Sequence, residues 1–152
     1  MFSLVIAVYK NEPSVPRLLA ALGTLAPTMP EALEVVFVVD GSPDQSYALL
    51  AAALPNLPFA AQLLAHSRNF GSFAAIRSGM QAARGDRFGV MAADLQEPPE
   101  LMRDFDVALL ADACDVAIGT RQTRADSALS PASPRLFWAL YRRWVAPDMP
   151  EG

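Results

Sequence analysis

Cysteine and histidine are almost absent from this sequence, which has one of each, Cys114 and His66. A single thiol cannot form a disulfide within the chain, and metal sites built from several cysteines or histidines are excluded. A serine–histidine catalytic triad could use only His66. We expect Cys114, which lies in an apolar stretch, to be a buried structural thiol. We expect His66 to have a structural role at the end of a strand.

Long apolar runs and positive charge are also scarce. The richest apolar segment, residues 48–65, is interrupted by Pro55, Asn56 and Pro58, so no run reaches the roughly 18 apolar residues of a membrane span. Met1 leads into an apolar stretch with no basic segment before it, which disfavours a signal peptide. The net charge of −4 argues against a nucleic-acid partner. These features predict a cytoplasmic location.

Two glycine-rich phosphate-binding motifs are missing as well. The sequence contains no Gly-x-Gly-x-x-Gly and no Gly-x-x-x-x-Gly-Lys-Ser/Thr, which disfavours dinucleotide-dependent oxidoreductases and P-loop enzymes. The sequence is rich in apolar residues: 53% of its 152 residues are hydrophobic, and 18% are charged. This balance predicts a folded domain with a substantial core rather than a disordered chain.

Apolar runs alternate with segments of helical spacing along much of the chain. Runs rich in β-branched residues predict five strands, at residues 3–8, 34–39, 59–66, 87–92 and 115–119. Helices are expected between them, at residues 14–26, 45–54, 73–84 and 98–110. Strands that alternate with helices form right-handed βαβ units. The sequence therefore predicts an α/β fold of three layers, α/β/α, around a mostly parallel sheet.

Capping residues mark the ends of several of these helices. Ser14 is expected to cap the first helix, and Ser42 or Asp44 the second. Gly85 fits the C′ position after the third helix. The third helix is supported by the helical spacing of four apolar residues: Phe73, Ile76, Met80 and Ala83.

Polar residues are concentrated in the loops that follow the predicted strands. In parallel sheets, ligands bind beyond the carboxyl ends of the strands. We therefore expect five loops to line one rim of the domain: residues 9–12, 40–44, 67–71, 94–97 and 119–121.

The loop at residues 94–97 is the best candidate for a metal site. Asp94 and Gln96 alternate at the end of a strand, so their side chains can face one cation, with Glu97 beside them. Carboxylate and carboxamide oxygens suit a hard divalent cation, and a diphosphate would supply further oxygens. The alternative is that Asp94 or Glu97 only caps the helix after Pro98. The spacing alone does not decide between the two.

Other polar residues at this rim carry a similar ambiguity. Asp40 follows a strand and precedes Gly41, so it could bind a ribose hydroxyl or a base, or it could form an ordinary Asp-Gly turn. Asn11 and Glu12 allow the same two interpretations. Three arginines could bind phosphate, or could be solvated surface charges: Arg68, Arg77 and Arg121.

Five sequence blocks, in order along the chain, carry a family resemblance. Residues 8–12 are similar to V-Y-N-E with Lys10 inserted, and residues 39–44 to D-D-G-S-x-D. Residues 67–86 are similar to S-R-N-F-G followed by A-A, G and A-x-G-D. Residues 92–100 are similar to D-A-D-L-Q-x-P-P-E, and residues 119–124 to G-x-R-x-x-R.

With these blocks, the chain resembles the family 2 glycosyltransferases of the GT-A fold. The resemblance is to the branch that contains dolichol-phosphate mannose synthase and bacterial polyprenyl-phosphate sugar transferases. It implies an inverting hexosyltransferase of cell-envelope polysaccharide or glycolipid synthesis. The implied donor is a UDP- or GDP-linked sugar, the acceptor is a polyprenyl phosphate or other lipid, and the cofactor is Mg²⁺ or Mn²⁺.

The resemblance also implies roles for individual residues. Asp94 and Gln96 would bind the metal that bridges the diphosphate. Arg121 would lie near the phosphates or the acceptor. No residue of the chain is identified as the catalytic base, and a base beyond Gly152 is left open. The full set expected to bind the nucleotide sugar is Tyr9, Asn11, Glu12, Asp40, Arg68, Asp94 and Arg121.

Two positions depart from the family pattern. Val39 stands at the first acid of D-D-G-S-x-D, and Ala92 at the first acid of D-x-D. Without a carboxylate at residue 92, either Asp94, Gln96 and the diphosphate suffice to hold the metal, or metal binding is weakened. The alternative function is therefore a non-catalytic nucleotide-sugar-binding or assembly module. A nucleotidyltransferase is less favoured, because residues 9–20 lack a Gly-rich basic motif.

The resemblance divides the chain into two regions. Residues 1–126 would form the donor-binding α/β domain, and residues 127–152 the incomplete start of an acceptor-side region. Residues 134–145 have the apolar spacing of an amphipathic helix. Family members continue well past this length, often with membrane helices. We therefore expect a fragment of a protein that acts at the inner face of the cell membrane.

Overall fold

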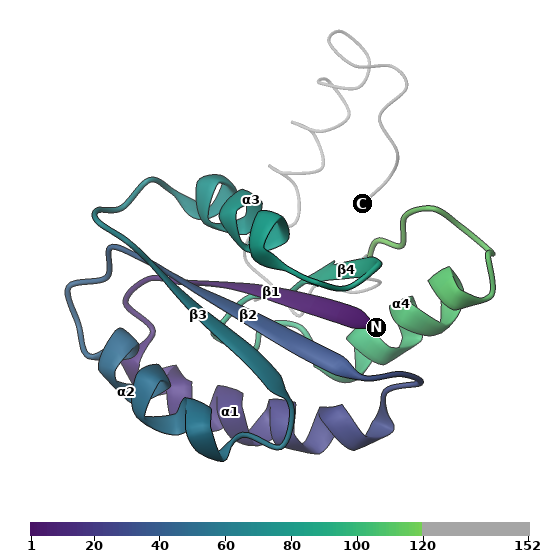
Figure 1. Ribbon diagram of the computed structural model, residues 1–152, viewed down its shortest axis with the longest axis horizontal. Coiled ribbons are helices and arrows are strands. Elements are labelled where there is room, and N and C mark those ends of the chain that lie inside the picture. Colours follow the sequence, from purple (N-terminus) through teal and green to yellow (C-terminus); the bar gives the residue numbers. More distant parts are fainter. Residues whose placement is uncertain (120–152) are drawn as a thin grey trace, which may run out of the picture. The chain divides into compact units, whose positions relative to one another are not determined.

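A computed structural model describes residues 1–119, which form a parallel β-sheet with helices on both faces (Figure 1). The strands are β1 (Phe2–Val8), β2 (Leu33–Asp40), β3 (Ala60–His66) and β4 (Arg87–Val90). The α-helices are α1 (Val15–Leu25), α2 (Ser46–Ala53), α3 (Ser72–Ala82) and α4 (Glu100–Leu110). Each of these elements lies within a few residues of its predicted position.

The four strands are all parallel, in the order β3-β2-β1-β4. From β1 the chain adds β2 and then β3 on one side, and it then crosses to the other side of β1 to place β4. The order of the strands therefore reverses between β1 and β4. In open parallel sheets this reversal opens a crevice at the carboxyl ends of the strands, where ligands bind.

The two faces of the sheet are buried by different helices. On one face, side chains of β1 such as Phe2, Leu4 and Ile6 pack in the larger core with residues of α1, α2 and α4. On the other face, Val5 and Val36 belong to a smaller core with α3. Figure 1 shows α1 and α2 on one side of the sheet and α3 on the opposite side. The prediction of three layers is confirmed.

The buried side of α3 is formed by small residues rather than by its larger apolar ones. Phe73 and Met80 are 88% and 42% exposed. The helix instead packs through the small residues Ala75 and Gly79, both of which are buried. A Cβ on Gly79 would lie 2.3 Å from Cγ1 of Val5, so α3 approaches the sheet too closely for a larger residue. Close packing of the backbone, rather than apolar spacing, decides which side of α3 is buried.

Two features after β4 were predicted wrongly. Residues 115–119, predicted as the fifth strand, form no strand, and Val116 and Ile118 are 71% and 79% exposed. The sheet described for residues 1–119 ends at β4, so the predicted fifth strand has no place in it. Cys114 is only partly buried rather than fully buried.

Two signals at helix ends also act differently from the prediction. Ser14 occupies the N-cap position of α1, but its side chain makes no capping hydrogen bond. Gly85 lies beyond Ala83, the C-cap of α3, and does not occupy the C′ position. A Cβ at residue 85 would lie 2.7 Å from the Ser3 hydroxyl, so the glycine allows close contact with β1.

Several sequence predictions concern residues outside the part that the structure describes. Those that remain predictions concern Arg121, Arg124, the helix at residues 134–145 and the domain boundary after residue 126. A catalytic base beyond Gly152, the last residue of the sequence, lies outside the described residues as well and remains untested. Among residues 1–119, no helix is long and apolar enough to cross a membrane.

Candidate functional site

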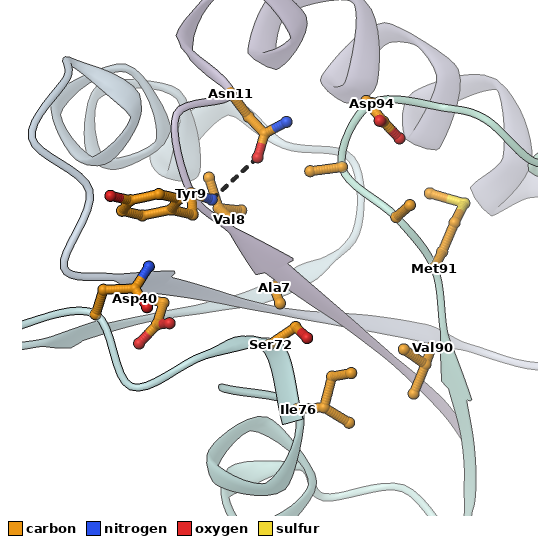
Figure 2. A pocket seen from close by; sticks show the side chains of 13 residues that line it. Ala7, Val8, Tyr9, Asn11, Asp40, Ser72, Ile76, Val90, Met91 and Asp94 are labelled. Atoms are coloured by element: carbon orange, nitrogen blue, oxygen red, sulfur yellow. Dashed lines mark hydrogen bonds between the residues drawn. The ribbon is translucent and has the colours of Figure 1, made fainter. Parts of the chain in front are cut away.

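A cavity of about 480 Å³ opens at the carboxyl ends of β1 and β4, where the strand order reverses. Its volume is in the range of small-molecule binding sites. Tyr9 and Asn11 contribute from the loop after β1, Asp40 from the end of β2, and Asp94 from the loop after β4 (Figure 2). These four residues were expected at a common rim, and the structure brings them to one cavity.

Other residues of the cavity were not expected from the sequence. Asn69, in the loop after β3, and Ser72, at the start of α3, add polar groups. Asn69 lies in the loop of residues 67–71, which the sequence placed at the rim of the domain. Nothing in the sequence marked Asn69 itself as a residue of the site. Much of the remaining lining is apolar and comes from β1, α3, the end of β4 and the chain after it: Ala7, Val8, Ile76, Val90, Met91, Ala92 and Ala93.

The loop after β1 is held by hydrogen bonds to the loop after β2. The Lys10 N–H donates to the Ser42 hydroxyl (2.7 Å), and the Glu12 N–H donates to Asp44 Oδ2 (3.0 Å). In return, the Gln45 N–H donates to Glu12 Oε2 (3.0 Å). The Glu12 carboxylate thus binds the start of α2, and Glu12 is not among the residues that line the cavity. Its position favours a role in holding the two loops together.

Asp44 is the centre of this contact between loops. Burial would raise the pKa of its carboxyl, but hydrogen bonds from Ser42, Ser46 and Glu12 outweigh this effect and lower the pKa to about 2. Asp44 also accepts the N–H of Ser46 (3.2 Å), the first residue of α2. The N-cap position of α2 is nevertheless Gln45, with no side-chain cap, so the prediction that Ser42 or Asp44 caps this helix is wrong. Asp44 binds the first N–H of the helix from one residue before the N-cap.

Tyr9 and Asn11 present their side chains at the mouth of the cavity. The Tyr9 N–H donates to Asn11 Oδ1 (3.0 Å), which fixes the amide group of Asn11 (Figure 2). The Tyr9 ring is 42% exposed, and the Lys10 ammonium lies 5.3 Å from its centre. An exposed aromatic ring beside a cavity offers a flat surface on which a base or sugar could stack.

Asp40 is almost fully buried, at 2% exposure, although it touches the cavity. Its carboxylate accepts the N–H groups of Phe70 (3.0 Å) and Gly71 (2.8 Å) and a bond from His66 Nδ1 (2.7 Å). Burial would raise the pKa of Asp40, but these hydrogen bonds outweigh it and lower the pKa. Both oxygens are thus engaged by the protein itself.

Among residues 1–119, the two arginines expected to bind phosphate, Arg68 and Arg77, do not line the cavity. Arg68 is exposed, and its guanidinium lies 4.7 Å from the centre of the Phe70 ring. Arg77 is exposed on α3. The structure therefore gives Arg68 an aromatic partner at the edge of the site, and its contact with a donor stays a prediction.

Asp94 and Gln96 lie together after β4, as expected. Asp94 Oδ2 accepts a hydrogen bond from Gln96 Nε2 (2.6 Å), while Asp94 Oδ1 is buried with no hydrogen-bond partner among residues 1–119. Leu95 between them has a φ of +59°, which shapes the turn. The N-cap position of α4 is Pro99, with no side-chain cap. The alternative that Asp94 or Glu97 only caps α4 is therefore wrong.

This pair fits a divalent cation. A buried carboxylate oxygen without a partner costs free energy, and a cation in contact with it would remove that cost. The carboxamide oxygen of Gln96 could supply a second ligand. Ala92 lines the same cavity without a carboxylate. Residues 1–119 contain no group of three or more acids, histidines or cysteines that could hold a metal without help. Further ligands would therefore come from a bound diphosphate or from water.

The sequence of residues 3–148 matches the family model described as Glycosyl transferase family 2. The chain belongs to this family. A relative from Pseudomonas paraeruginosa, undecaprenyl-phosphate 4-deoxy-4-formamido-L-arabinose transferase, is 39% identical over 128 residues. That match covers 84% of this chain and 38% of the relative, so the chain spans well under half of the relative's length.

Solved glycosyltransferase structures share the fold of this family 2 chain. Staphylococcus aureus TarS 1–349 in complex with UDP-GlcNAc matches with a TM-score of 0.53 at 22% identity, over 61% of this chain and 26% of TarS. The mannosyltransferase PcManGT from Pyrobaculum calidifontis, in complex with GDP-Man and Mn²⁺, matches with a TM-score of 0.56 at 19% identity. That match covers 70% of this chain and 32% of PcManGT. The expected GT-A fold is confirmed.

Proposed function

We propose that this chain is the donor-binding part of an inverting, metal-dependent glycosyltransferase that transfers a sugar from a nucleotide diphosphate to a polyprenyl phosphate. One observation carries the proposal. At the crevice between β1 and β4, Asp94 holds a buried oxygen with no partner among residues 1–119, next to the carboxamide of Gln96. A site of this kind suits a cation that is completed by a bound diphosphate.

The nucleotide sugar is the donor best supported. TarS and PcManGT, which share the fold, bind UDP-GlcNAc and GDP-Man. In this chain, Tyr9 and Asn11 at the mouth of the cavity would contact the nucleoside, and Asp40 would shape the same wall. Glu12 would act through the loops that it joins. Arg68, and Arg121 outside the described residues, would contact the phosphates.

The metal would be held by Asp94 and Gln96. Mg²⁺ or Mn²⁺ held there would supply Lewis-acid chemistry, the neutralisation of charge on the leaving diphosphate. A protein site with a single carboxylate leaves most positions on the cation for phosphate oxygens and water. Mn²⁺ is present in the related structure of PcManGT. Asp94 would also orient the donor, because it fixes where the diphosphate can lie.

The acceptor is proposed from the relatives. The Pseudomonas relative is named for an undecaprenyl-phosphate acceptor. We infer that a phosphate oxygen of such a lipid attacks the anomeric carbon from the face opposite the diphosphate, which inverts the configuration. The lipid would place the complete protein at the inner face of the cell membrane, in cell-envelope synthesis.

A binding titration tests the metal and the donor together. UDP- and GDP-sugars are titrated into the protein with and without Mn²⁺ or Mg²⁺, and into Asp94→Asn. We expect metal-dependent binding that weakens at least about tenfold in Asp94→Asn, since even second-shell changes at metal sites cost about tenfold or more. Asp104→Asn is the matched control, because Asp104 is exposed on α4 and pairs with Arg103. Binding that needs no metal and is equal in Asp94→Asn would contradict the proposal.

A second candidate function is a non-catalytic nucleotide-sugar-binding module. Ala92 favours it, because it lines the cavity where the family pattern has an acid. Turnover separates the two candidates. A longer form of the protein that transfers sugar to polyprenyl phosphate would establish the enzyme. Tight donor binding without transfer by that form would establish the binding module.

A further inference from the structure

His66, the only histidine of the chain, joins the ends of two strands to one helix. Its Nδ1 lies 2.7 Å from Asp40 Oδ1, and its Nε2 lies 3.0 Å from the hydroxyl of Ser78 on α3. Asp40 ends β2 and His66 ends β3, so the imidazole connects β2, β3 and α3. The side chains of His66 and Asp40 are 16% and 3% exposed. The proposed donor and metal contacts do not use this histidine.

The hydrogen bonds to the ring also determine which nitrogen carries the proton when the imidazole is neutral. A carboxylate can only accept, so the proton on Nδ1 points to Asp40. Nε2 then accepts from the Ser78 hydroxyl in the neutral ring and donates to it in the charged ring. Both nitrogens are therefore engaged in either state. His66 is not among the residues that line the cavity, and this position argues against a role as a catalytic base.

Through Asp40, this histidine is linked to residues 67–71, the loop after β3. The two oxygens of Asp40 accept the N–H groups of Phe70 and Gly71. The Phe70 ring meets the imidazole edge-to-face at 5.4 Å. The Gly71 N–H also lies 3.1 Å from Asn69 Oδ1. These contacts hold the second half of the loop in one conformation.

The first half of the loop is held by close contact with the turn after β2. Gly41 has a φ of +60°, and a Cβ there would lie 2.2 Å from the carbonyl carbon of Arg68. The loop backbone thus rests directly on the backbone of this glycine. Asn69 from the loop and Ser72 just after it both line the cavity. The position of one wall of the cavity therefore depends on these contacts.

We propose that His66 is a positioning residue, which acts through Asp40 to fix residues 67–71 as a wall of the donor cavity and so sets the affinity for the nucleotide. The proposal rests on the proposed function only for the identity of the ligand. The geometry of the anchor, formed by His66, Asp40, Ser78 and the loop amides, can be tested without any ligand.

Two substitutions separate the hydrogen bond from the bulk of the ring. His66→Leu removes the donor to Asp40 and leaves an apolar side chain of similar width. His66→Asn keeps an N–H group at the position of Nδ1, so it retains that donor. Gln62→Leu is the matched control: it is on the same strand, and its amide bonds Glu34 and the Ala82 carbonyl rather than the cavity loop.

The first measurement is the dissociation constant for UDP and for GDP, by calorimetry. We expect His66→Leu to weaken binding about tenfold, because a hydrogen bond to a charged group is lost and the wall loosens. His66→Asn should restore affinity to within about threefold of the original protein. Gln62→Leu should lower stability and leave the dissociation constant unchanged. Equal loss in both His66 variants, or none in His66→Leu, would overturn the proposal.

The second measurement needs no nucleotide. Hydrogen exchange of the Phe70 and Gly71 amides, followed by NMR, should be faster in His66→Leu and unchanged in Gln62→Leu. If the original protein binds neither UDP nor GDP, the proposed function fails, and these amides still decide whether the anchor exists. Exchange at both amides that is unchanged in His66→Leu would overturn the positioning role.

Discussion

Asp94 and Ala92 lie two residues apart in the loop after β4, and both line the cavity. The family resemblance places a carboxylate at each of these positions, and this chain keeps only the second. The remaining carboxylate has a buried oxygen with no partner among the described residues. Metal affinity in this protein should therefore depend on the charge that a bound diphosphate adds.

That dependence predicts the effect of Ala92→Asp. A second carboxylate near the first should raise the affinity for Mn²⁺ in the absence of nucleotide by on the order of tenfold or more, because affinity rises with the charge of the ligands. Ala92→Asn is the control for size without charge. Titration of Mn²⁺ followed by electron paramagnetic resonance measures both variants. Equal affinities of Ala92→Asp and Ala92→Asn would show that residue 92 does not face the cation.

Individual site residues could be predicted from the sequence to different degrees. The proximity of Asp94 and Gln96 could be predicted, because a strand end, a carboxylate and a carboxamide follow one another within a few residues. The engagement of Asp40 by the Phe70 and Gly71 amides could not be predicted. It joins residues about 30 positions apart, and no local pattern encodes such a contact. Sequence reasoning thus locates the site better than it assigns the partners within it.

At the scale of elements, β1 and β2 were the easiest to predict. Both are buried along nearly their whole length, so they appear in the sequence as continuous apolar runs. The side of α3 that faces the sheet could not be predicted from apolar spacing, because the small residues that form it carry little hydrophobic signal. Ala75 and Gly79 are buried through close approach, while the larger Phe73 stays exposed.

Alanine substitutions at two helical glycines should have opposite effects on stability, because Gly79 in α3 is crowded by the sheet and Gly23 in α1 is not. Gly79→Ala would place a Cβ 2.3 Å from Val5 Cγ1 and 3.1 Å from Val38 Cγ2, and should destabilise the fold by about 1–3 kcal/mol. Gly23→Ala in α1 meets only Pro58 Cγ at 3.9 Å, and should stabilise by up to about 1 kcal/mol through helix propensity. Urea unfolding measures both. A stabilising Gly79→Ala would show that α3 moves away from the sheet at little cost.

At the scale of the whole molecule, the loops at the carboxyl ends of the strands are joined by buried or half-buried carboxylates. Asp44 joins the loops after β1 and β2, and Asp40 joins the end of β2 to the loop after β3. Hydrogen bonds outweigh burial and lower the pKa of both groups. The hydrogen bonds that join the loops at the rim of the site are therefore strongest when Asp40 and Asp44 are ionised.

This arrangement predicts how stability depends on pH. The pKa of Asp44 falls from its ordinary value of 3.8 to about 2 in the folded protein. Between these values the unfolded state binds more protons than the folded state, so stability falls as the pH falls. The contribution of Asp44 is complete above about pH 5 and is lost as the pH passes through about 2. The pKa of Asp40 is also lowered and adds to the same trend.

Urea unfolding at a series of pH values from about 7 to about 2.5 measures this loss. Asp44→Asn should be less stable than the original protein near neutral pH, because a neutral amide is a weaker acceptor for the amides of Glu12 and Ser46. The difference between the two proteins should then shrink between about pH 4 and about pH 2.5, because the Asp44 carboxylate of the unfolded original protein takes up its proton in that interval. A difference that stays constant over that interval would show that Asp44 does not carry the acid sensitivity. The acid sensitivity would then come from other carboxyls with a lowered pKa, such as Asp40 and Glu34.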